Sequence, residues 1–462
     1  MPEQQHPIYD AAIIGGGPAG YSAALRIAQL GGKACLIEKH KVGGACATVG
    51  CIPTKALSHL AEFSKTAQRM KALGILEGGG SWHFQKVQAH LRQIVAESVA
   101  GVQSTIKRQG IPIVMGTAVV TGKNEITILN RDGKVETSFV AKNIVWATGS
   151  SPKRLEDLPA SRSIITSDEA LSLDALPKTL GIIGGGYIGL EFASIFSALG
   201  TKVYLIEALP TIAPTEEPEI ADAIQRFLKK SGVEAITNAT IGTVQETKEA
   251  LSLTIISKDS CQLPPILVEK LLVAVGRVPN LPVEELHRLG VSYTPVGISV
   301  NAYLETNVPG VYAIGDVIPT PRLAHVGIHE GRIAAENIMG KRRAISYATI
   351  PSCMYTVPEV ASIGQREGSI GRCFFLANGK ARAMQRMEGF IKVYIKQQKL
   401  VGAAIVGWQA SELLGVVAGF LGRDVEDIKQ KIIAHPTLSE MISEALIDAE
   451  RQAANSPQPP GF

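Results

Sequence analysis

Two glycine-rich turns, GGGPAG at residues 15–20 and GGGYIG at residues 184–189, constrain the fold of this chain more than any other feature. Each turn follows a short apolar strand pattern and precedes an amphipathic helix pattern. Each helix pattern leads into a second strand pattern that ends at an acidic residue, Glu38 or Glu207. The strand patterns cover residues 9–14, 33–37, 179–183 and 202–206, and the helix patterns run to about residues 30 and 199. Both segments are therefore predicted to be βαβ units of the kind that bind dinucleotides.

The chemistry of such a unit follows from its glycines. The first glycine permits the tight turn, the second lets the backbone approach a pyrophosphate, and the third lets helix and strand pack closely. The helix N-terminus then offers free N–H groups and the positive end of the helix dipole to the phosphates. The acids are placed where a carboxylate accepts hydrogen bonds from ribose hydroxyls. A single glycine turn is weak evidence, but two complete copies predict two bound dinucleotides.

Length and composition exclude several classes of protein. A chain of 462 residues is too long for one hydrophobic core and predicts several domains. The net charge of +4 is small, and the densest basic run, residues 341–343, is interpreted as a solvated helix end, so no nucleic-acid partner is expected. We expect no membrane span, because the longest apolar stretch, residues 182–199, contains Glu191 and a glycine turn. The first ten residues carry no pattern typical of a targeting peptide, so a cytoplasmic location is expected.

The remaining patterns divide the chain further. A helical pair is predicted over residues 57–109, a strand-rich stretch over 111–145, and a strand over 310–314. From about residue 344 the pattern changes to strands, including 389–396 and 399–406, followed by helices, which is typical of a separate α+β domain. The tail, residues 456–462, is rich in proline and is expected to be loose.

The cysteines point to redox chemistry. Cys46 and Cys51 lie in GGACATVGCIPTK, residues 43–55, directly after the first βαβ unit. Small neighbours leave room for a flat ring against the sulfurs, and a nearby helix start lowers a thiol pKa. The alternative interpretation is two unrelated buried thiols. No second Cys or His pair has ligand spacing, so no metal site is expected. The other four cysteines, expected to be buried or inert, are Cys35, Cys261, Cys353 and Cys373.

These motifs together resemble the pyridine nucleotide-disulfide oxidoreductases, and most closely the dihydrolipoamide dehydrogenases among them. The resemblance covers nearly the whole chain and includes, besides the cysteine segment, ATG at 147–149, GRVPN at 276–280, YAIGD at 312–316, LAH at 323–325 and HPTLSE at 435–440. It implies two Rossmann-like domains and a C-terminal dimerisation domain. The implied boundaries are 1–148 for the FAD-binding domain, 149–275 for the NAD-binding domain, 276–343 for a central domain and 344–462 for the interface domain.

The resemblance also implies the cofactor sites. FAD would be held by Gly15, Gly17, Gly20, Glu38, Lys55, Thr148, Gly149, Asp316 and Ala324. NAD would be held by Gly184, Gly186, Gly189, Glu207 and Gly276. No arginine follows Glu207 in residues 208–211, and a carboxylate there repels a 2′-phosphate, so NAD is favoured over NADP.

The implied catalytic residues are Cys51 against the flavin ring, Cys46 as the sulfur that meets the substrate, and Lys55 paired with Glu191 near the flavin. The alternatives are an ordinary surface lysine for Lys55 and an exposed helix charge for Glu191.

The family also supplies a base across a two-fold interface from the cysteines of the other subunit. This base would be His435, with Glu440 as its orienting partner. The alternative for Glu440 is structural, because Thr437 and Glu440 also form a capping-box pattern.

The reaction implied is oxidation of dihydrolipoamide, carried by the lipoyl domain of a 2-oxoacid dehydrogenase or glycine-cleavage complex, with reduction of NAD. Two alternatives stay open: a related reductase of another small disulfide, and a flavoprotein kept as a non-catalytic assembly subunit. Two departures from the family pattern are Ile433, where a second histidine is usual, and a short segment at residues 364–377.

Overall fold

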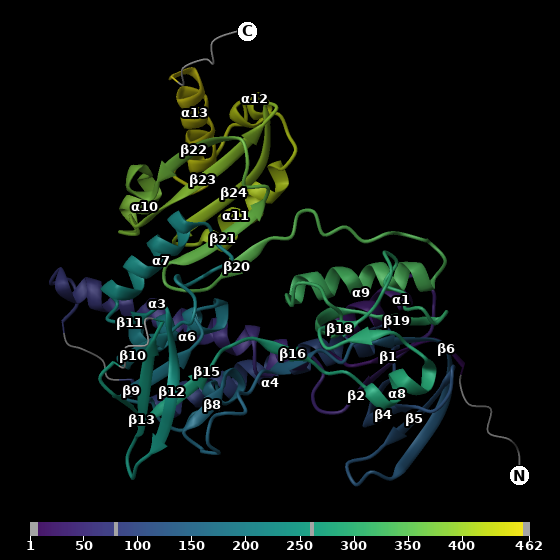
Figure 1. Ribbon diagram of the computed structural model, residues 1–462. Coiled ribbons are helices and arrows are strands. Elements are labelled where there is room, and N and C mark those ends of the chain that lie inside the picture. The colour runs from purple at the N-terminus through teal and green to yellow at the C-terminus, as the bar shows by residue number, and fades with distance from the viewer. Residues whose placement is uncertain (1–7, 78–81, 259–262, 456–462) are drawn as a thin grey trace, which may run out of the picture.

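The computed structural model describes residues 8–77, 82–258 and 263–455. Cys261 and the proline-rich tail lie outside these ranges. Figure 1 shows two sheet-containing lobes side by side and a third that stands above the second of them. Within the described ranges, no helix combines the length and the apolar character needed to cross a membrane.

The first lobe is built on a seven-stranded sheet in the order β3-β2-β1-β6-β5-β4, with β19 added beside β6. β1 is parallel to both β2 and β6, as the βαβ pattern predicts. The N-terminal elements are β1 (Ile8–Ile14), α1 (Pro18–Gln29), β2 (Ala34–Glu38), β3 (Ile113–Met115), β4 (Thr117–Val120), β5 (Glu125–Leu129) and β6 (Val135–Trp146). The strand predicted over 310–314 is β19 (Val311–Ala313), which returns to this sheet from much later in the chain.

Helix α9 (Ala324–Ile338) lies against α1 in the same lobe (Figure 1). Glycines on α9 make this close contact possible. A Cβ atom added at Gly331 would lie 2.3 Å from the carbonyl oxygen of Ala19, and one at Gly327 would lie 3.2 Å from the Ala19 Cβ. Residues of the 276–343 segment therefore share the hydrophobic core of the first lobe.

The helical pair begins earlier than predicted. α3 spans Cys51–Ala72 and α4 spans Phe84–Arg108, so the first helix starts at Cys51 rather than near residue 57. A short helix, α2 (Gly44–Thr48), precedes it and carries Cys46. The prediction missed this start because the turn before Cys51 is set by packing around Gly50, where a Cβ would lie 2.9 Å from the Ala45 carbonyl oxygen.

The second lobe repeats the βαβ design in a parallel sheet with the order β11-β10-β9-β15-β8. Its elements are β8 (Ile164–Thr166), α5 (Ser167–Ala170), β9 (Thr179–Ile183), α6 (Tyr187–Ala198), β10 (Lys202–Ile206), α7 (Pro218–Lys230), β11 (Glu234–Ile236) and β15 (Lys270–Val273). An antiparallel sheet of β12 (Ala239–Glu246), β13 (Leu251–Ser257) and β14 (Ile266–Val268) adjoins it. β7 (Ser150–Pro152) and β16 (Arg277–Pro279) pair between the lobes, and α8 (Val283–Leu289), β17 (Tyr293–Thr294) and β18 (Gly297–Ile298) follow.

The C-terminal lobe is an antiparallel sheet in the order β20-β21-β24-β23-β22, covered by helices. Its elements are β20 (Ser352–Met354), β21 (Glu359–Gly364), β22 (Ser369–Phe374), α10 (Gly379–Ala383), β23 (Gly389–Lys396), β24 (Lys399–Gly407), α11 (Ala410–Phe420), α12 (Val425–Lys429) and α13 (Glu440–Asn455). The predicted fold class, two Rossmann-like α/β domains followed by an α+β domain, is confirmed.

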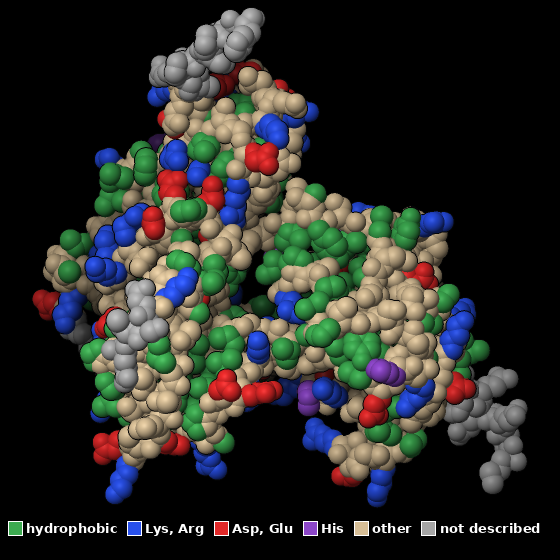
Figure 2. Space-filling model, in the orientation of Figure 1, with side chains coloured by type: hydrophobic (Ala, Val, Ile, Leu, Met, Phe, Trp, Pro, Cys, Tyr) green, Lys and Arg blue, Asp and Glu red, His purple; other side chains and the backbone are tan. Residues whose placement is uncertain are grey.

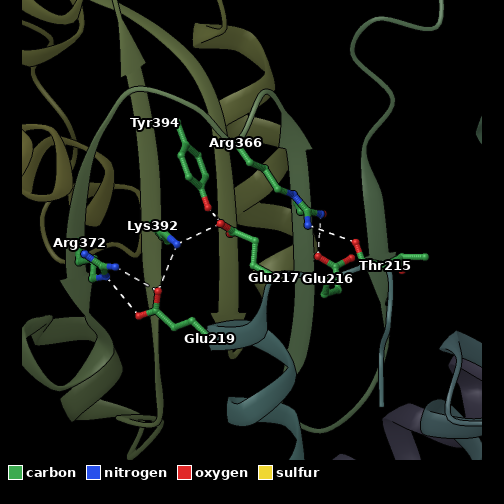
Figure 3. A network of polar contacts seen from close by, with 9 residues as sticks. Thr215, Glu216, Glu217, Glu219, Arg366, Arg372, Lys392 and Tyr394 are labelled. Carbon is green, nitrogen blue, oxygen red and sulfur yellow. Dashed lines mark hydrogen bonds and ion pairs between the residues drawn. The ribbon is translucent and has the colours of Figure 1, made fainter. Parts of the chain in front are cut away.

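Ion pairs and hydrogen bonds join the start of α7 to the C-terminal sheet (Figure 3). Arg372 donates through Nε and Nη2 to the two carboxylate oxygens of Glu219, at 3.2 and 3.1 Å. Lys392, whose side chain is only 6% exposed, lies 3.2 Å from both Glu217 and Glu219, and the Tyr394 hydroxyl donates to Glu217. Because Lys392 is buried between two carboxylates of α7, these contacts join the second lobe to the C-terminal lobe.

Candidate active site

A single cleft of about 1770 Å³ joins the two glycine turns to the cysteine segment. The surface is deeply indented between the first and second lobes (Figure 2). Most of the predicted site residues line the cleft: Gly15, Gly17, Glu38, Cys46, Cys51, Lys55, Thr148, Gly149, Gly184, Gly186, Glu191, Glu207, Gly276, Asp316 and Ala324. Gly20, Gly189, His435 and Glu440 do not line it.

The glycines of the first turn differ in what surrounds them. Gly15 has φ +114°, and a Cβ there would lie 2.2 Å from the carbonyl oxygen of Ala147; a Cβ at Gly20 would lie 1.9 Å from that of Gly15. Both positions are therefore closed by the protein's own backbone. At Gly17 a Cβ would meet only the Gly44 Cα, at 3.9 Å, so this side of the turn is open. No side chain caps the helix that begins there, and its free N–H groups with the open space fit a pyrophosphate.

The second turn repeats this arrangement. A Cβ at Gly184, which has φ +105°, would lie 2.5 Å from the Ala274 carbonyl oxygen, and one at Gly189 would lie 1.9 Å from that of Gly184. A Cβ at Gly186 would meet nothing within 4 Å, and α6 also begins without a side-chain cap. The residues at both turns thus fit a dinucleotide, with the first and third glycines serving the packing and the middle glycine facing the cleft.

The two acids at the strand ends are buried and bond to their own glycine turns. Glu38 accepts the N–H of Gly16 at 2.8 Å and that of His40 at 2.7 Å. Glu207 accepts the N–H of Gly185 at 2.5 Å and that of Leu209 at 2.8 Å. A carboxylate has about four acceptor positions, so each keeps capacity for hydroxyl donors from the cleft.

Cys46 and Cys51 both lie at the wall of the cleft. Hydrogen bonding with Cys46, together with the positive charge of Lys55, lowers the pKa of Cys51 to about 7. Hydrogen bonding with Cys51, together with burial, raises the pKa of Cys46. Cys51 is therefore the sulfur that ionises first, and Cys46 keeps its proton.

A partly buried ion pair lies beside the cysteines. Lys55 Nζ lies 3.0 and 3.2 Å from the two carboxylate oxygens of Glu191, which is buried, so neither residue is the free surface charge of the alternative interpretations. The N–H of Tyr355 donates to Glu191 at 2.9 Å, and the Tyr355 ring centroid is 4.3 Å from Lys55 Nζ. The sequence carried no signal for Tyr355, because it reaches the pair from the start of the C-terminal lobe.

The single cysteines fall into two groups. Burial raises the pKa of Cys35 to about 12 and that of Cys373 to about 11, in keeping with inert thiols. Cys353 is half-buried and lines the cleft, and burial raises its pKa to about 11. The raised pKa is in keeping with the prediction of an inert thiol, whereas its place at the cleft wall, to which β20 brings it, was not predicted.

Asp316 reaches the cleft from a turn that a buried acid holds in place. The Ser150 hydroxyl donates to Asp316 at 2.6 Å. Directly before Asp316, the N–H of Gly315 donates at 2.6 Å to Glu330, which is fully buried on α9. Glu330 also accepts the Tyr347 hydroxyl, at 2.9 Å. Glu330 was not predicted from the sequence, since a lone acid within a helix pattern gives no signal of its role.

The ATG segment, residues 147–149, and the GRVPN segment, residues 276–280, are joined by two reciprocal hydrogen bonds. Thr148 donates its hydroxyl to the Asn280 carbonyl at 2.7 Å, and the Asn280 amide donates to the Thr148 carbonyl at 3.0 Å. Gly149 and Gly276 both have positive φ, +71° and +110°, which favours glycine at these two positions.

A tyrosine at the second turn links the cleft to the C-terminal lobe. Tyr187, the first residue of α6, lines the cleft, and its hydroxyl lies 2.6 Å from both Glu216 and Ser352. Glu216 is in turn paired with Arg366 at 2.8 Å, and Arg366 also donates to the Thr215 carbonyl (Figure 3). This chain of contacts was not predicted.

His435 and Glu440 are in contact with each other and away from the cleft of their own chain. His435 Nδ1 lies 2.8 Å from Glu440, whose second oxygen accepts the Thr437 N–H at 2.8 Å. The backbone bond and the contact with His435 lower the pKa of Glu440. The Glu440 carboxylate thus makes both predicted contacts: one oxygen orients the imidazole of His435, and the other caps the backbone at the start of α13. The His435 side chain is 76% exposed on the C-terminal lobe.

Comparison with known proteins supports the same assignment. The family described as Pyridine nucleotide-disulphide oxidoreductase matches residues 9–331, and its dimerisation domain matches residues 350–446. The dihydrolipoyl dehydrogenase of Bacillus subtilis is 38% identical over 94% of this chain and 97% of its own length. That of Geobacillus stearothermophilus is 36% identical over 94% of this chain and 95% of its own length.

Solved structures agree in fold. The crystal structure of LpdA from Mycobacterium tuberculosis has a TM-score of 0.86 at 25% identity and covers 96% of this chain and 99% of its own. The HOCl-induced flavoprotein disulfide reductase RclA from Escherichia coli, as its Cu(II) complex, has a TM-score of 0.84 at 24% identity over 96% of this chain and 99% of its own. With its matched dimerisation domain the protein is a homodimer, and the chain belongs to the pyridine nucleotide-disulphide oxidoreductase family.

Proposed function

We propose that this enzyme is a dihydrolipoyl dehydrogenase, which oxidises protein-bound dihydrolipoamide and reduces NAD⁺. The observation that carries the proposal is the Cys46–Cys51 pair, with one readily ionised sulfur, in a cleft shared by two dinucleotide turns. The relatives named dihydrolipoyl dehydrogenase, which match nearly the full chain, support the choice of substrate. The partner is the lipoyl domain of a 2-oxoacid dehydrogenase or glycine-cleavage complex, and the location is the cytoplasm.

The cofactor sites follow from the two turns. FAD is assigned to the first turn, with Glu38 at its ribose and Asp316 beside it, and NAD to the second turn, with Glu207 at its ribose. When bound, FAD accepts two electrons from the thiols and passes a hydride to the nicotinamide. The buried carboxylate of Glu207 disfavours the 2′-phosphate of NADP.

The thiol chemistry is assigned to the cysteines. Starting from the Cys46–Cys51 disulfide, a substrate thiolate attacks the sulfur of Cys46, and Cys51 leaves as a thiolate. The second substrate thiol then displaces Cys46, which takes up a proton, and oxidised lipoamide is released. Two electrons and one proton now reside on the cysteine pair, as Cys51 thiolate and Cys46 thiol, which matches the order of ionisation in this structure.

Proton transfer is assigned to His435 of the partner subunit. A neutral imidazole can accept a proton from the substrate thiol and return it to Cys46. Glu440 orients the ring through Nδ1, which leaves Nε2 to face the substrate. The exposure of His435 and its distance from the cleft of its own chain support a role across the dimer interface.

The test is NADH formation by the purified dimer given dihydrolipoamide and NAD⁺, with NADP⁺ in a parallel reaction. We expect rapid turnover with NAD⁺ and little with NADP⁺. A yellow protein whose flavin is reduced by NADH, but which does not oxidise dihydrolipoamide, would reject this substrate and favour another small disulfide.

A further inference from the structure

A second cavity, of about 390 Å³, lies where the three lobes meet. It is bounded by the middle of α3, the end of α7 and the C-terminal lobe, including Trp408. It shares no lining residue with the cleft that holds the cysteines. Its size is within the range of sites that bind small molecules, and the proposed function makes no use of it.

Two cations of α3 line this cavity without a carboxylate partner. Lys65 Nζ donates to the Ser231 hydroxyl and to the Val357 carbonyl, both at 2.9 Å. Arg69 donates to the carbonyl of Gln385. In the part of the chain that the structure describes, neither Lys65 nor Arg69 makes an ion pair. An ammonium has three N–H donors and a guanidinium five, so both side chains keep donors beyond these hydrogen bonds.

Burial and neighbouring charges disfavour the charged form of Lys65. Burial, together with the positive charges of Arg386 and Arg69, lowers the pKa of Lys65 to about 8, although Glu388 opposes this. Burial also lowers the pKa of Arg386, which pairs with Glu62 at 3.1 Å. Charges removed from water are stabilised by an opposite charge with well-formed hydrogen bonds.

The acids around the cavity leave a positive excess. Glu62 is matched by Arg386, and Glu388 is matched by Lys230 at 3.1 Å. A third acid, Glu359, has its pKa raised by burial and accepts two hydrogen bonds from Ser411. Four cations, Lys65, Arg69, Lys230 and Arg386, thus face three acids, so one positive charge stays uncompensated even with Glu359 ionised.

We propose that this cavity binds a small oxyanion that carries phosphate or carboxylate groups, held between Lys65 and Arg69. A guanidinium presents a planar fork that suits phosphate or carboxylate, and the lysine adds a point charge beside it. The bound anion joins α3, the helix that begins at Cys51, to the second and C-terminal lobes. It therefore stabilises the arrangement of the three lobes around the redox site.

The test uses the FAD-loaded dimer with saturating NAD⁺, so that the phosphate-binding turns are occupied. Inorganic phosphate is titrated at constant ionic strength, with chloride as the balancing anion, and thermal unfolding and calorimetric binding are measured. We expect a saturable rise in the unfolding midpoint, since a ligand that binds only the folded state stabilises it. Citrate in place of phosphate distinguishes a carboxylate ligand from a phosphate ligand.

Substitutions of the cavity residues test whether the phosphate binds at this site. Lys65→Met and Arg69→Met each remove one charged hydrogen-bond donor and should weaken the phosphate response by about tenfold or more. Lys71→Met is the matched control, because Lys71 is exposed on the same helix and does not line the cavity; its response should equal that of the wild type. If Lys65→Met does not fold, Lys65→Gln replaces it. An equal response in all variants, or no saturation beyond the effect of chloride, would overturn the proposal.

Discussion

The hydrogen bond from Cys46 to Cys51 sets which sulfur is ionised, and it can be removed with little change in volume. In Cys46→Ala the donor is lost, whereas in Cys46→Ser a hydroxyl donor stays in nearly the same place. The bond from Cys46 is the largest of the causes that lower the pKa of Cys51 from 9.0 to about 7. Without it, burial again opposes ionisation, and the pKa of Cys51 should return to 9 or above.

The size of the effect follows from this shift. Two pKa units correspond to about 3 kcal/mol of preferential stabilisation of the thiolate. At pH 7 the thiolate fraction of Cys51 should fall from about one half in Cys46→Ser to about one in a hundred in Cys46→Ala, roughly a 50-fold loss. Lys55 remains in both variants, so the comparison isolates the hydrogen bond.

The assay is ultraviolet absorbance of the thiolate as a function of pH. A Cys46→Ala, Cys51→Ala double variant supplies the background from the other cysteines, whose pKa values are raised where the structure describes them. We expect a titration near pH 7 in Cys46→Ser that moves upward by about two units in Cys46→Ala. Superimposable titrations in the two variants would refute the assignment of the low pKa to this bond.

Four further outcomes are expected. Glu191→Gln should lower the pKa of Cys51 further, because the Glu191 charge opposes its ionisation; the same titration measures this, and a rise would contradict it. Gly17→Ala should give a folded protein with weakened FAD binding in reconstitution assays, since the added Cβ enters the open side of the turn; unchanged FAD affinity would count against that site. His435→Gln should slow dihydrolipoamide oxidation by on the order of 10²–10⁴ with little change in the unfolding midpoint, and an undiminished rate would remove His435 from the mechanism. Lys392→Met should lower the free energy of unfolding in urea by about 3 kcal/mol, because it leaves the Glu217 carboxylate without a cation and Glu219 with Arg372 alone; a loss below about 1 kcal/mol would mean that this network is as weak as a surface pair.

Local sequence was sufficient for features whose geometry depends on near neighbours. The glycine turns were predictable because Gly15 and Gly184 need positive φ and because Gly20 and Gly189 contact atoms five residues earlier. The predicted bounds of strands β9 and β23 were confirmed to the residue. Each strand is a short, largely apolar run whose ends are visible in the local sequence. The spacing of the cysteine pair indicated contact between the sulfurs, but their order of ionisation needed the three-dimensional arrangement.

Residue types at fixed spacings along the chain were enough to predict the fold class, which is confirmed, and to propose the residues of the site. The distant groups that complete the site could be found only in the folded structure. The backbone N–H of Tyr355 on Glu191, the buried carboxylate of Glu330 under the Gly315 turn, and the contacts of Glu217 with Lys392 each join separate elements. No local pattern encodes such contacts, because they depend on how whole lobes pack, and packing is decided by the combined shape of buried surfaces.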